Sequence, residues 1–224
     1  MRTPAQVREI VRLLLAEYPE AACTLDWGKD YELLFSVRLA AQCTDERVNR
    51  ITPALFARFP TLEAFANADV AEVEQYIHSC GFFRAKARDL VACAQVLLEK
   101  YGGELPRTME ELTSLLGVGR KTDNLILGDV FRVPGSTVVD THCIRLSNRL
   151  GLVDGLRDPV KIEMALRKIL PPEDSSTFCH CLVLHGRAVC DARRPACERC
   201  CVKHLCQTAP ASTKGDAEAE GEII

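Results

Sequence analysis

Four cysteines near the C-terminus have the spacing of a metal site. They follow a Cys-x6-Cys-x2-Cys-x5-Cys pattern at Cys190, Cys197, Cys200 and Cys206. Thiolates this close together are typical of a soft metal ion or an iron–sulfur cluster. Zinc is the alternative, although all-cysteine zinc sites usually pair two Cys-x2-Cys knuckles and only one is present. Cys201 is a possible decoy beside Cys200, and burial of all four as packing residues is disfavoured by the arginines around them.

A lysine and an aspartate upstream of these cysteines could act together on a substrate. Lys121 follows a Gly-x-Gly turn at the start of an expected helix, and Asp140 ends a short apolar run. The positive helix end and the adjacent Arg120 disfavour the ammonium form of Lys121, which favours a neutral amine able to act as a nucleophile. Asp140 could stabilise positive charge nearby or simply cap the next helix. Lys121 could equally be an ordinary solvated charge.

The turn before Lys121 could bind a phosphate. Gly117 and Gly119 allow positive φ angles and a close approach of the backbone. Their N–H groups lie next to a helix N-terminus, so they can bind one phosphate without regard to base sequence. The pattern is typical of a helix-hairpin-helix element, and a plain tight turn between helices is the alternative. No strand precedes it, so it is not a nucleotide-binding fingerprint.

The composition is that of an ordinary soluble globular protein. The chain has 224 residues, of which 47% are apolar and 26% charged. These values exclude collagen-like and low-complexity chains. No apolar stretch approaches the ~18 residues that a membrane-spanning helix needs, and the N-terminus is unlike a signal peptide. We therefore expect a cytoplasmic protein with no membrane partner.

Charge and cysteines are unevenly distributed along the chain. The net charge is −3, but residues 186–206 carry five basic and two acidic residues, which favours a local surface for nucleic acid. The acidic tail at 207–224 is expected to be disordered. In a reducing compartment the other cysteines are expected to be packing residues. They are Cys23, Cys43, Cys80, Cys93, Cys143, Cys179 and Cys181.

Helical periodicity dominates the sequence and predicts an all-α fold. Thr3 and Pro4 have the residue types of a helix N-cap and first helical position, as do Asp158 and Pro159. Gly102 is typical of a helix C-terminus. The stretch 137–139 is the one short β-like piece.

Taken together, these motifs resemble the endonuclease III-type DNA glycosylases, a family within the helix-hairpin-helix glycosylase superfamily. The resemblance runs from about residue 33 to residue 206. It rests on LAAQCTD at 39–45, GVGRKT at 117–122, VDTH at 139–142, LHGR at 184–187 and the 6-2-5 cysteine spacing.

The resemblance implies two helical domains with DNA in the groove between them. The first is a six-helix domain over residues 24–134 that carries the helix-hairpin-helix. The second combines residues 1–23 with 135–206 and holds a [4Fe–4S] cluster on Cys190, Cys197, Cys200 and Cys206. Residues 207–224 form the tail outside both domains.

The resemblance also implies an activity in base excision repair. Lys121 matches the lysine that attacks C1′ of a damaged nucleotide, and Asp140 matches the essential aspartate. The nucleotide must first leave the duplex to be reached. The implied enzyme is a bifunctional DNA glycosylase and abasic-site lyase that removes oxidised pyrimidines. A lysine imine and β-elimination then break the strand.

Further residues are expected to contact DNA. Gln42 is expected to fill the gap left by the extruded nucleotide, and Phe82 to wedge beside it. The alternatives are a buried hydrogen-bonding role for Gln42 and a core position for Phe82. Arg193 and Arg194 are expected to reach phosphates from the loop that a cluster would fix, or to be solvated charges. The remaining expected contacts are Gly117, Val118, Gly119, Arg120, Thr122 and His142.

Three residues depart from the family pattern. Leu116 stands where proline is usual, Ala40 where serine is common, and Asp123 where alanine is common. Asp123 is the consequential one, because a carboxylate near a phosphate-binding turn should repel DNA and weaken or alter activity.

Three other functions are consistent with parts of the sequence. A monofunctional mismatch glycosylase of the same fold would generally lack a lysine at position 121. A non-catalytic iron–sulfur protein that binds DNA or senses damage would need neither Lys121 nor Asp140. A small zinc-binding structural module is a third alternative. We expect a monomer that acts on duplex DNA at the nucleoid.

Overall fold

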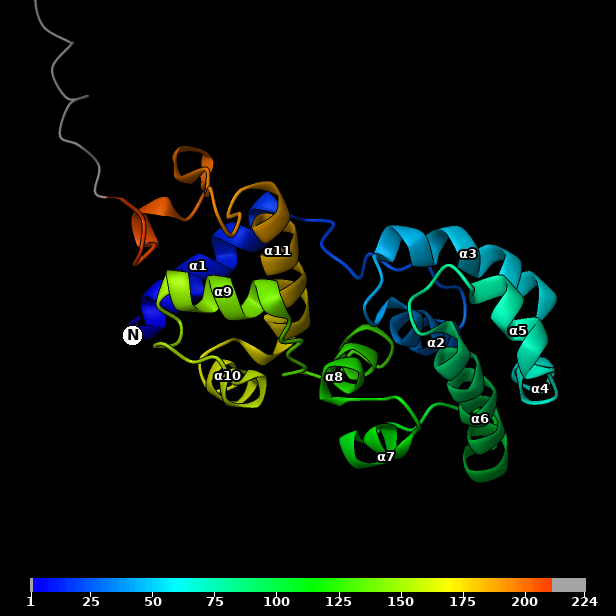
Figure 1. Cartoon of the computed structure of the whole chain (residues 1–224). Helices are drawn as coiled ribbons and strands as arrows, with labels where there is room; N and C mark the ends of the chain where they lie inside the picture. Colours follow the sequence, from blue (N-terminus) through cyan, green and yellow to red (C-terminus); the bar gives the residue numbers. More distant parts are fainter. Residues whose placement is uncertain (1, 211–224) are drawn as a thin grey trace, which may run out of the picture.

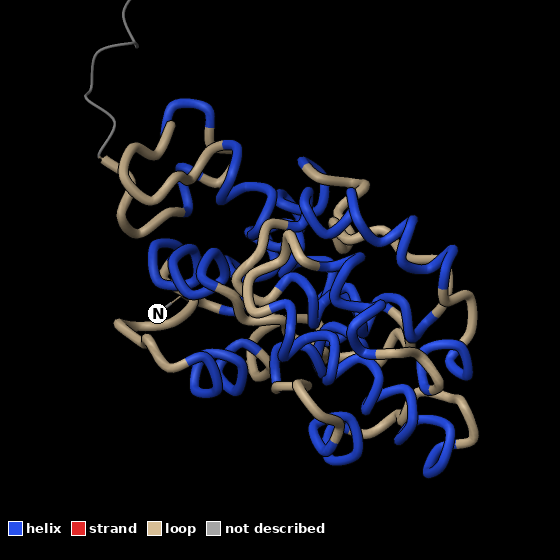
Figure 2. Tube along the Cα trace, turned by 45° about the vertical axis from the view of Figure 1, so that its right-hand side comes forward, coloured by secondary structure: helices blue, strands red, loops and turns tan. Residues whose placement is uncertain are grey.

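The computed structural model describes residues 2–210, and within them the chain is helical with no strands (Figure 1, Figure 2). This confirms the predicted all-α fold class. The helices are α1 (Pro4–Glu17), α2 (Asp30–Ala40), α3 (Asp45–Arg58), α4 (Leu62–Ala66), α5 (Val70–Ile77), α6 (Phe83–Tyr101), α7 (Met109–Ser114), α8 (Arg120–Asp129), α9 (Thr141–Leu150), α10 (Pro159–Leu166) and α11 (Ser175–Ala188). Three 3-10 turns are η1 (Pro172–Asp174), η2 (Cys197–Arg199) and η3 (Lys203–Leu205).

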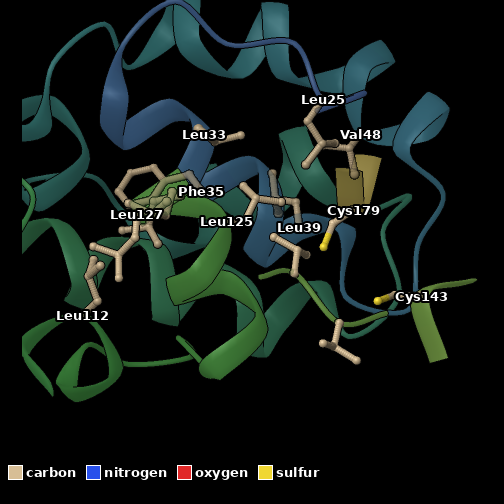
Figure 3. Packing of buried hydrophobic residues seen from close by; sticks show 14 of the residues in the cluster. Leu25, Leu33, Phe35, Leu39, Val48, Leu112, Leu125, Leu127, Cys143 and Cys179 are labelled. Carbon is tan, nitrogen blue, oxygen red and sulfur yellow. The ribbon is translucent and has the colours of Figure 1, made fainter. Parts of the chain in front are cut away.

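The helices form two groups in space (Figure 1). Helices α2 to α8 lie together, with α4 and α5 packed on α6 and α8 packed on α2. Helix α11 contacts both α1 and α9, so the N-terminal helix joins the C-terminal part of the chain. One apolar core runs through both groups, and Figure 3 shows part of it. The expected domain division at 24–134, and at 1–23 with 135–206, stays a prediction.

Local sequence signals account for where several helices begin and end. Thr3 caps α1 in a reciprocal capping box, and Pro4 is its first residue. The side chain of Asp158 caps α10, which begins at Pro159. Helix α6 ends at Gly102, whose φ of 62° is the left-handed conformation that favours glycine. These three predictions are confirmed.

The segment 137–139 is irregular and forms no strand, although its sequence is β-like. It lies between α8 and α9, where no neighbouring chain runs beside it to form a ladder within the described residues. Hydrogen bonds hold it instead: the Thr137 N–H donates to Asn124 Oδ1 at 2.9 Å, and Thr137 Oγ1 donates to Gly135 O at 3.0 Å. The position of Asp140, three residues later, therefore depends on α8.

Most of the cysteines expected to be packing residues are buried. They are Cys80, Cys93, Cys143, Cys179 and Cys181. Cys23 and Cys43 are only partly buried. The tail expected at 207–224 lies outside the described residues from position 211 onward. No helix among the described residues combines the length and apolar character needed to cross a bilayer.

Candidate functional site

Lys121 and Asp140 line the same cavity, which has a volume of about 310 Å³. Lys121 is the second residue of α8, and Asp140 is the residue just before α9. The cavity walls come from both helix groups: the C-terminal end of α2, the start of α8, the segment 22–25 and the inner side of α11. An amine and a carboxylate at the starts of two consecutive helices thus line one hollow that is open to solvent.

Asp140 has a position that is compatible with both alternatives from the sequence. Its Oδ1 accepts a hydrogen bond of 2.7 Å from the Cys143 N–H, so it caps α9. It also lines the cavity, as the catalytic interpretation requires. The cap fixes the carboxylate in one orientation, which is what an electrostatic role needs.

His142 lies beside Asp140 but turns toward α11. Its Nδ1 lies 3.0 Å from Arg145 Nη2, so the guanidinium donates and the imidazole accepts. Burial lowers the pKa of His142, and the positive charges of Arg145 and Arg187 lower it further. The imidazole is therefore a neutral, partly buried group, and its expected contact with DNA stays a prediction.

The hairpin between α7 and α8 has a positive φ at one of its two glycines. Gly117 has a φ of 78°, whereas Gly119, the residue before α8, is extended with a φ of −105°. A Cβ added at Gly117 would clash with the Arg38 side chain, so a larger residue fits there only if Arg38 moves. Gly119 is exposed and open, and its neighbour Val118 is partly buried. Because no atoms crowd the surface at Gly119, a phosphate could approach the free N–H groups at the N-terminus of α8.

Arg120 is engaged within the protein. Its Nε and Nη2 donate to the two carboxylate oxygens of Glu163 at 2.6 and 3.0 Å. Glu163 is almost fully buried and also pairs with Arg167 at 3.1 Å. Because this ion pair occupies the Arg120 guanidinium, the side chain is less available to a phosphate than the sequence suggested.

Asp123 lies at a place that the sequence did not predict. Its side chain has no exposed surface, and both carboxylate oxygens lack a hydrogen-bond partner. Burial raises its pKa to about 6, and the charge of Glu163 adds to the effect. Asp123 thus faces the protein interior near α10, so direct repulsion of DNA from the hairpin surface is not the role of this residue.

Gln42 and Phe82, here called the wedge pair, are both exposed and both in the left-handed conformation. Their φ angles are 55° and 58°, and 68% of Phe82 is exposed. The alternatives of a core phenylalanine and a buried glutamine are therefore wrong. Both residues line a small hollow on the surface. Positive φ at two non-glycine residues is strain of the kind that clusters at functional sites.

A buried lysine that the sequence did not single out connects the two residues of the wedge pair. Lys86 on α6 is 1% exposed, and its Nζ donates to Leu39 O at 2.9 Å and Ala41 O at 2.7 Å. These carbonyls end α2 just before Gln42, and Phe82 lies one helical turn before Lys86. Burial lowers the pKa of this lysine. One buried ammonium thus joins the two loops.

An ion pair between Asp45 and Arg187 also lines the cavity. Asp45 accepts hydrogen bonds from Thr24 at 2.6 Å and from Arg187 at 3.1 Å. Asp45 and Arg187 belong to the LAAQCTD and LHGR motifs, 142 residues apart, so only the fold shows that they pair. Thr122 lines the same cavity.

The four candidate metal ligands line one cavity of about 280 Å³. Cys201 is not among its lining residues, which favours Cys200 over Cys201 as a ligand. Arg149 Nη1 lies 3.2 Å from Cys190 Sγ, and His185 Nε2 lies 3.3 Å from Cys200 Sγ. Hydrogen bonds of this kind stabilise thiolates around a metal centre.

The chemistry of this donor set bears on what it could hold. Four cysteine sulfurs on one cavity are the donors that both an iron–sulfur cluster and an all-cysteine zinc site use. All-cysteine zinc sites usually pair two Cys-x2-Cys knuckles, and this site has one. The donor set therefore fits an iron–sulfur cluster.

Arg193 and Arg194 lie in the loop between the first two of these cysteines. Both side chains are exposed, and both backbone N–H groups donate to Asp191 Oδ1, at 2.8 and 3.1 Å. The loop thus has its own fixed turn. The expected contact of these arginines with phosphate stays a prediction.

Comparison with known proteins agrees with this geometry. Residues 35–172 match the family described as "HhH-GPD superfamily base excision DNA repair protein". The chain belongs to this HhH-GPD superfamily. It is 47% identical to endonuclease III of Synechocystis sp. over 204 residues, which are 91% of this chain and 93% of the relative. It is 36% identical to endonuclease III of Escherichia coli K12 over 199 residues, 89% of this chain and 93% of the relative.

Solved structures of HhH-GPD proteins place the fold. A trapped endonuclease III–DNA covalent intermediate matches with a TM-score of 0.85 and 39% identity, over 92% of this chain and 97% of that one. A thermostable thymine-DNA glycosylase matches with a TM-score of 0.81 but only 22% identity, over 91% and 96%, and so shows the fold alone. The predicted resemblance to endonuclease III-type proteins is confirmed.

Proposed function

We propose that this protein is a bifunctional DNA glycosylase and abasic-site lyase that removes oxidised pyrimidines from duplex DNA. The observation that carries the proposal is that Lys121 and Asp140 line one cavity. A monofunctional glycosylase does not need an amine there, and a DNA-binding sensor needs neither residue. The relatives named endonuclease III support the same activity.

The geometry suggests how the reaction proceeds. The damaged nucleotide rotates out of the duplex into the cavity. As the bond between the base and C1′ weakens, the fixed carboxylate of Asp140 stabilises the positive charge that develops on the sugar. The Lys121 amine attacks C1′, the base leaves with the electrons of its bond, and the sugar ring opens to an imine.

Strand cleavage follows from the imine. A proton leaves C2′, the electrons form a new double bond, and the 3′ phosphate departs with the electrons of its C3′–O bond. Water then hydrolyses the imine and restores the Lys121 amine.

Both helix groups supply walls of the cavity, which supports binding of duplex DNA between the two expected domains. In this arrangement the wedge pair enters the duplex and the hairpin holds one phosphate. A protein that acts on the chromosome would work in the cytoplasm at the nucleoid. We infer a monomer, because each chain carries a complete site.

We also infer that Cys190, Cys197, Cys200 and Cys206 hold a [4Fe–4S] cluster. When bound, it would serve as a structural centre that fixes the loop carrying Arg193 and Arg194. Purified protein should contain about four irons and four sulfides per chain and absorb broadly in the visible range. Cys197→Ser should lose them, and Cys201→Ser should retain them. Bound zinc without iron would contradict the inference.

Reductive trapping tests the proposed activity. Borohydride should join the wild type covalently to duplex DNA that carries an oxidised thymine, because it reduces the imine. Lys121→Gln should form no adduct, and the control Lys168→Gln, which changes an exposed lysine outside the cavity, should form as much as the wild type. Base release without an adduct would favour a monofunctional glycosylase. Binding without either would favour a damage sensor.

A further inference from the structure

A histidine that the proposed mechanism does not use also lines the cavity. His180 on α11 is 9% exposed and faces the same hollow as Lys121 and Asp140. Its Nε2 lies 3.0 Å from each carboxylate oxygen of Asp129. Asp129 is itself buried and accepts a further hydrogen bond of 2.9 Å from Ser176 Oγ. An imidazole held this firmly at a cavity wall has a defined orientation toward a ligand.

The pairing also fixes which ring nitrogen is available. A carboxylate at Nε2 requires an N–H there, because an unprotonated nitrogen would face the negative oxygens. Nδ1 is then the nitrogen left for a ligand. It accepts a hydrogen bond when the imidazole is neutral, and an N–H group on a bound molecule can supply it.

The position of Asp129 shows which part of a nucleotide His180 can meet. Asp129 ends α8, and Lys121 is the second residue of this helix, so eight residues separate them. At 1.5 Å per residue their backbones are about 12 Å apart along the axis. Leu125 lies between them and also lines the cavity. With C1′ at the Lys121 amine, the far part of the cavity holds the base and not the sugar.

We propose that His180, oriented by Asp129, contacts the extruded base through a hydrogen bond to its polar edge, and so determines base excision without serving strand cleavage. This inference rests on the proposed glycosylase function. The N3–H of an oxidised pyrimidine is a suitable donor for Nδ1. Asp129 is the positioning residue, because it touches the imidazole and not the nucleotide.

Two substrates distinguish a role in base excision from a role in strand cleavage. One is a duplex with a single thymine glycol, and the other is the same duplex with a preformed abasic site, which has no base to contact. His180→Gln keeps an amide N–H that can donate to Asp129 but lacks Nδ1. We expect its single-turnover rate to fall roughly ten- to a hundredfold on thymine glycol, as for a lost buried hydrogen bond, and to change less than about twofold on the abasic site.

Matched variants complete the experiment. Asp129→Asn should show a smaller loss, again confined to the duplex with a base. His78→Gln, the same substitution at an exposed histidine outside the cavity, should behave as wild type on both duplexes. An equal loss on both substrates for His180→Gln, or no loss on either, would overturn the inference. If the wild-type protein releases no base from the thymine glycol duplex, both the proposed function and this inference are wrong. The wild-type measurement alone shows this outcome, so it is distinguished from a failure of this inference only.

Discussion

Asp123 should make the protein less stable at neutral and alkaline pH than in mild acid. The carboxylate has no exposed surface and no hydrogen-bond partner, and burial raises its pKa from 3.8 to about 6. The folded protein therefore prefers the protonated form. The stability that depends on this proton is fully present below pH 3.8 and is lost as the pH rises through about 6.

The magnitude follows from the size of the shift. Each pKa unit corresponds to about 1.36 kcal/mol, so the ionised carboxylate destabilises the fold by about 3 kcal/mol at pH 8. Asp123→Asn keeps the shape and removes the charge. We expect it to raise the free energy of unfolding by about 3 kcal/mol at pH 8 and only about 1 kcal/mol at pH 4.5.

Urea unfolding followed by circular dichroism at the two pH values measures this difference. Asp154→Asn is a matched control, since Asp154 is exposed and the same charge is removed. Its effect should stay within about 0.5 kcal/mol at both pH values. Asp123→Ala, which has no polar atom to leave unpaired, is a second variant in case the new amide disturbs packing. A gain that is equal at both pH values, or a loss at pH 8, would refute the reasoning.

Three further predictions concern the hairpin, the wedge pair and the arginine loop. Gly117→Ala should lower the free energy of unfolding by about 1–3 kcal/mol in thermal or urea unfolding, because its φ is 78° and its Cβ would meet Arg38; an unchanged midpoint would contradict this. Lys86→Met should lower it by about 1–3 kcal/mol, because two carbonyls lose their buried donor; it should also slow base excision, and an unaffected rate would show that the wedge pair needs no such support. If Arg193 and Arg194 each bind a phosphate, the double alanine variant should reduce the slope of log affinity against log salt by about 2 in fluorescence anisotropy; an unchanged slope would make them solvated charges.

The sequence predicts those features of the site that lie within a short stretch of chain. The helix caps at Thr3 and Asp158, the Gly117 turn and the four-cysteine pattern depend on neighbours within about ten residues, and the structure bears out the caps and the turn. Lys121 could be singled out for the same reason. Caps and turns can be predicted from a short stretch of sequence because their partners lie within it. The function of a single motif can be predicted only when several motifs are considered together.

The features that the sequence could not supply depend on partners far along the chain. Lys86 binds carbonyls 45 and 47 residues away, and His180 meets Asp129 at a separation of 51 residues. Residue type alone does not show whether a lysine is buried or solvated, so the burial of Lys86 is seen only in the packed structure. Asp123 is the same case, since its place beside the phosphate-binding turn suggested a carboxylate that repels DNA, and the fold buries it completely.

Helix α8 is the element that joins these observations. One side presents Lys121 to the cavity, another buries Asp123 toward α10, and its last residue holds His180. Asn124 is the remaining link, because its Nδ2 donates to Arg120 O at 3.0 Å while its Oδ1 accepts from the Thr137 N–H. This amide ties the irregular segment that leads to Asp140 to the first turn of the helix that carries Lys121. The separation of amine and carboxylate is thus set by a buried side chain that touches neither of them.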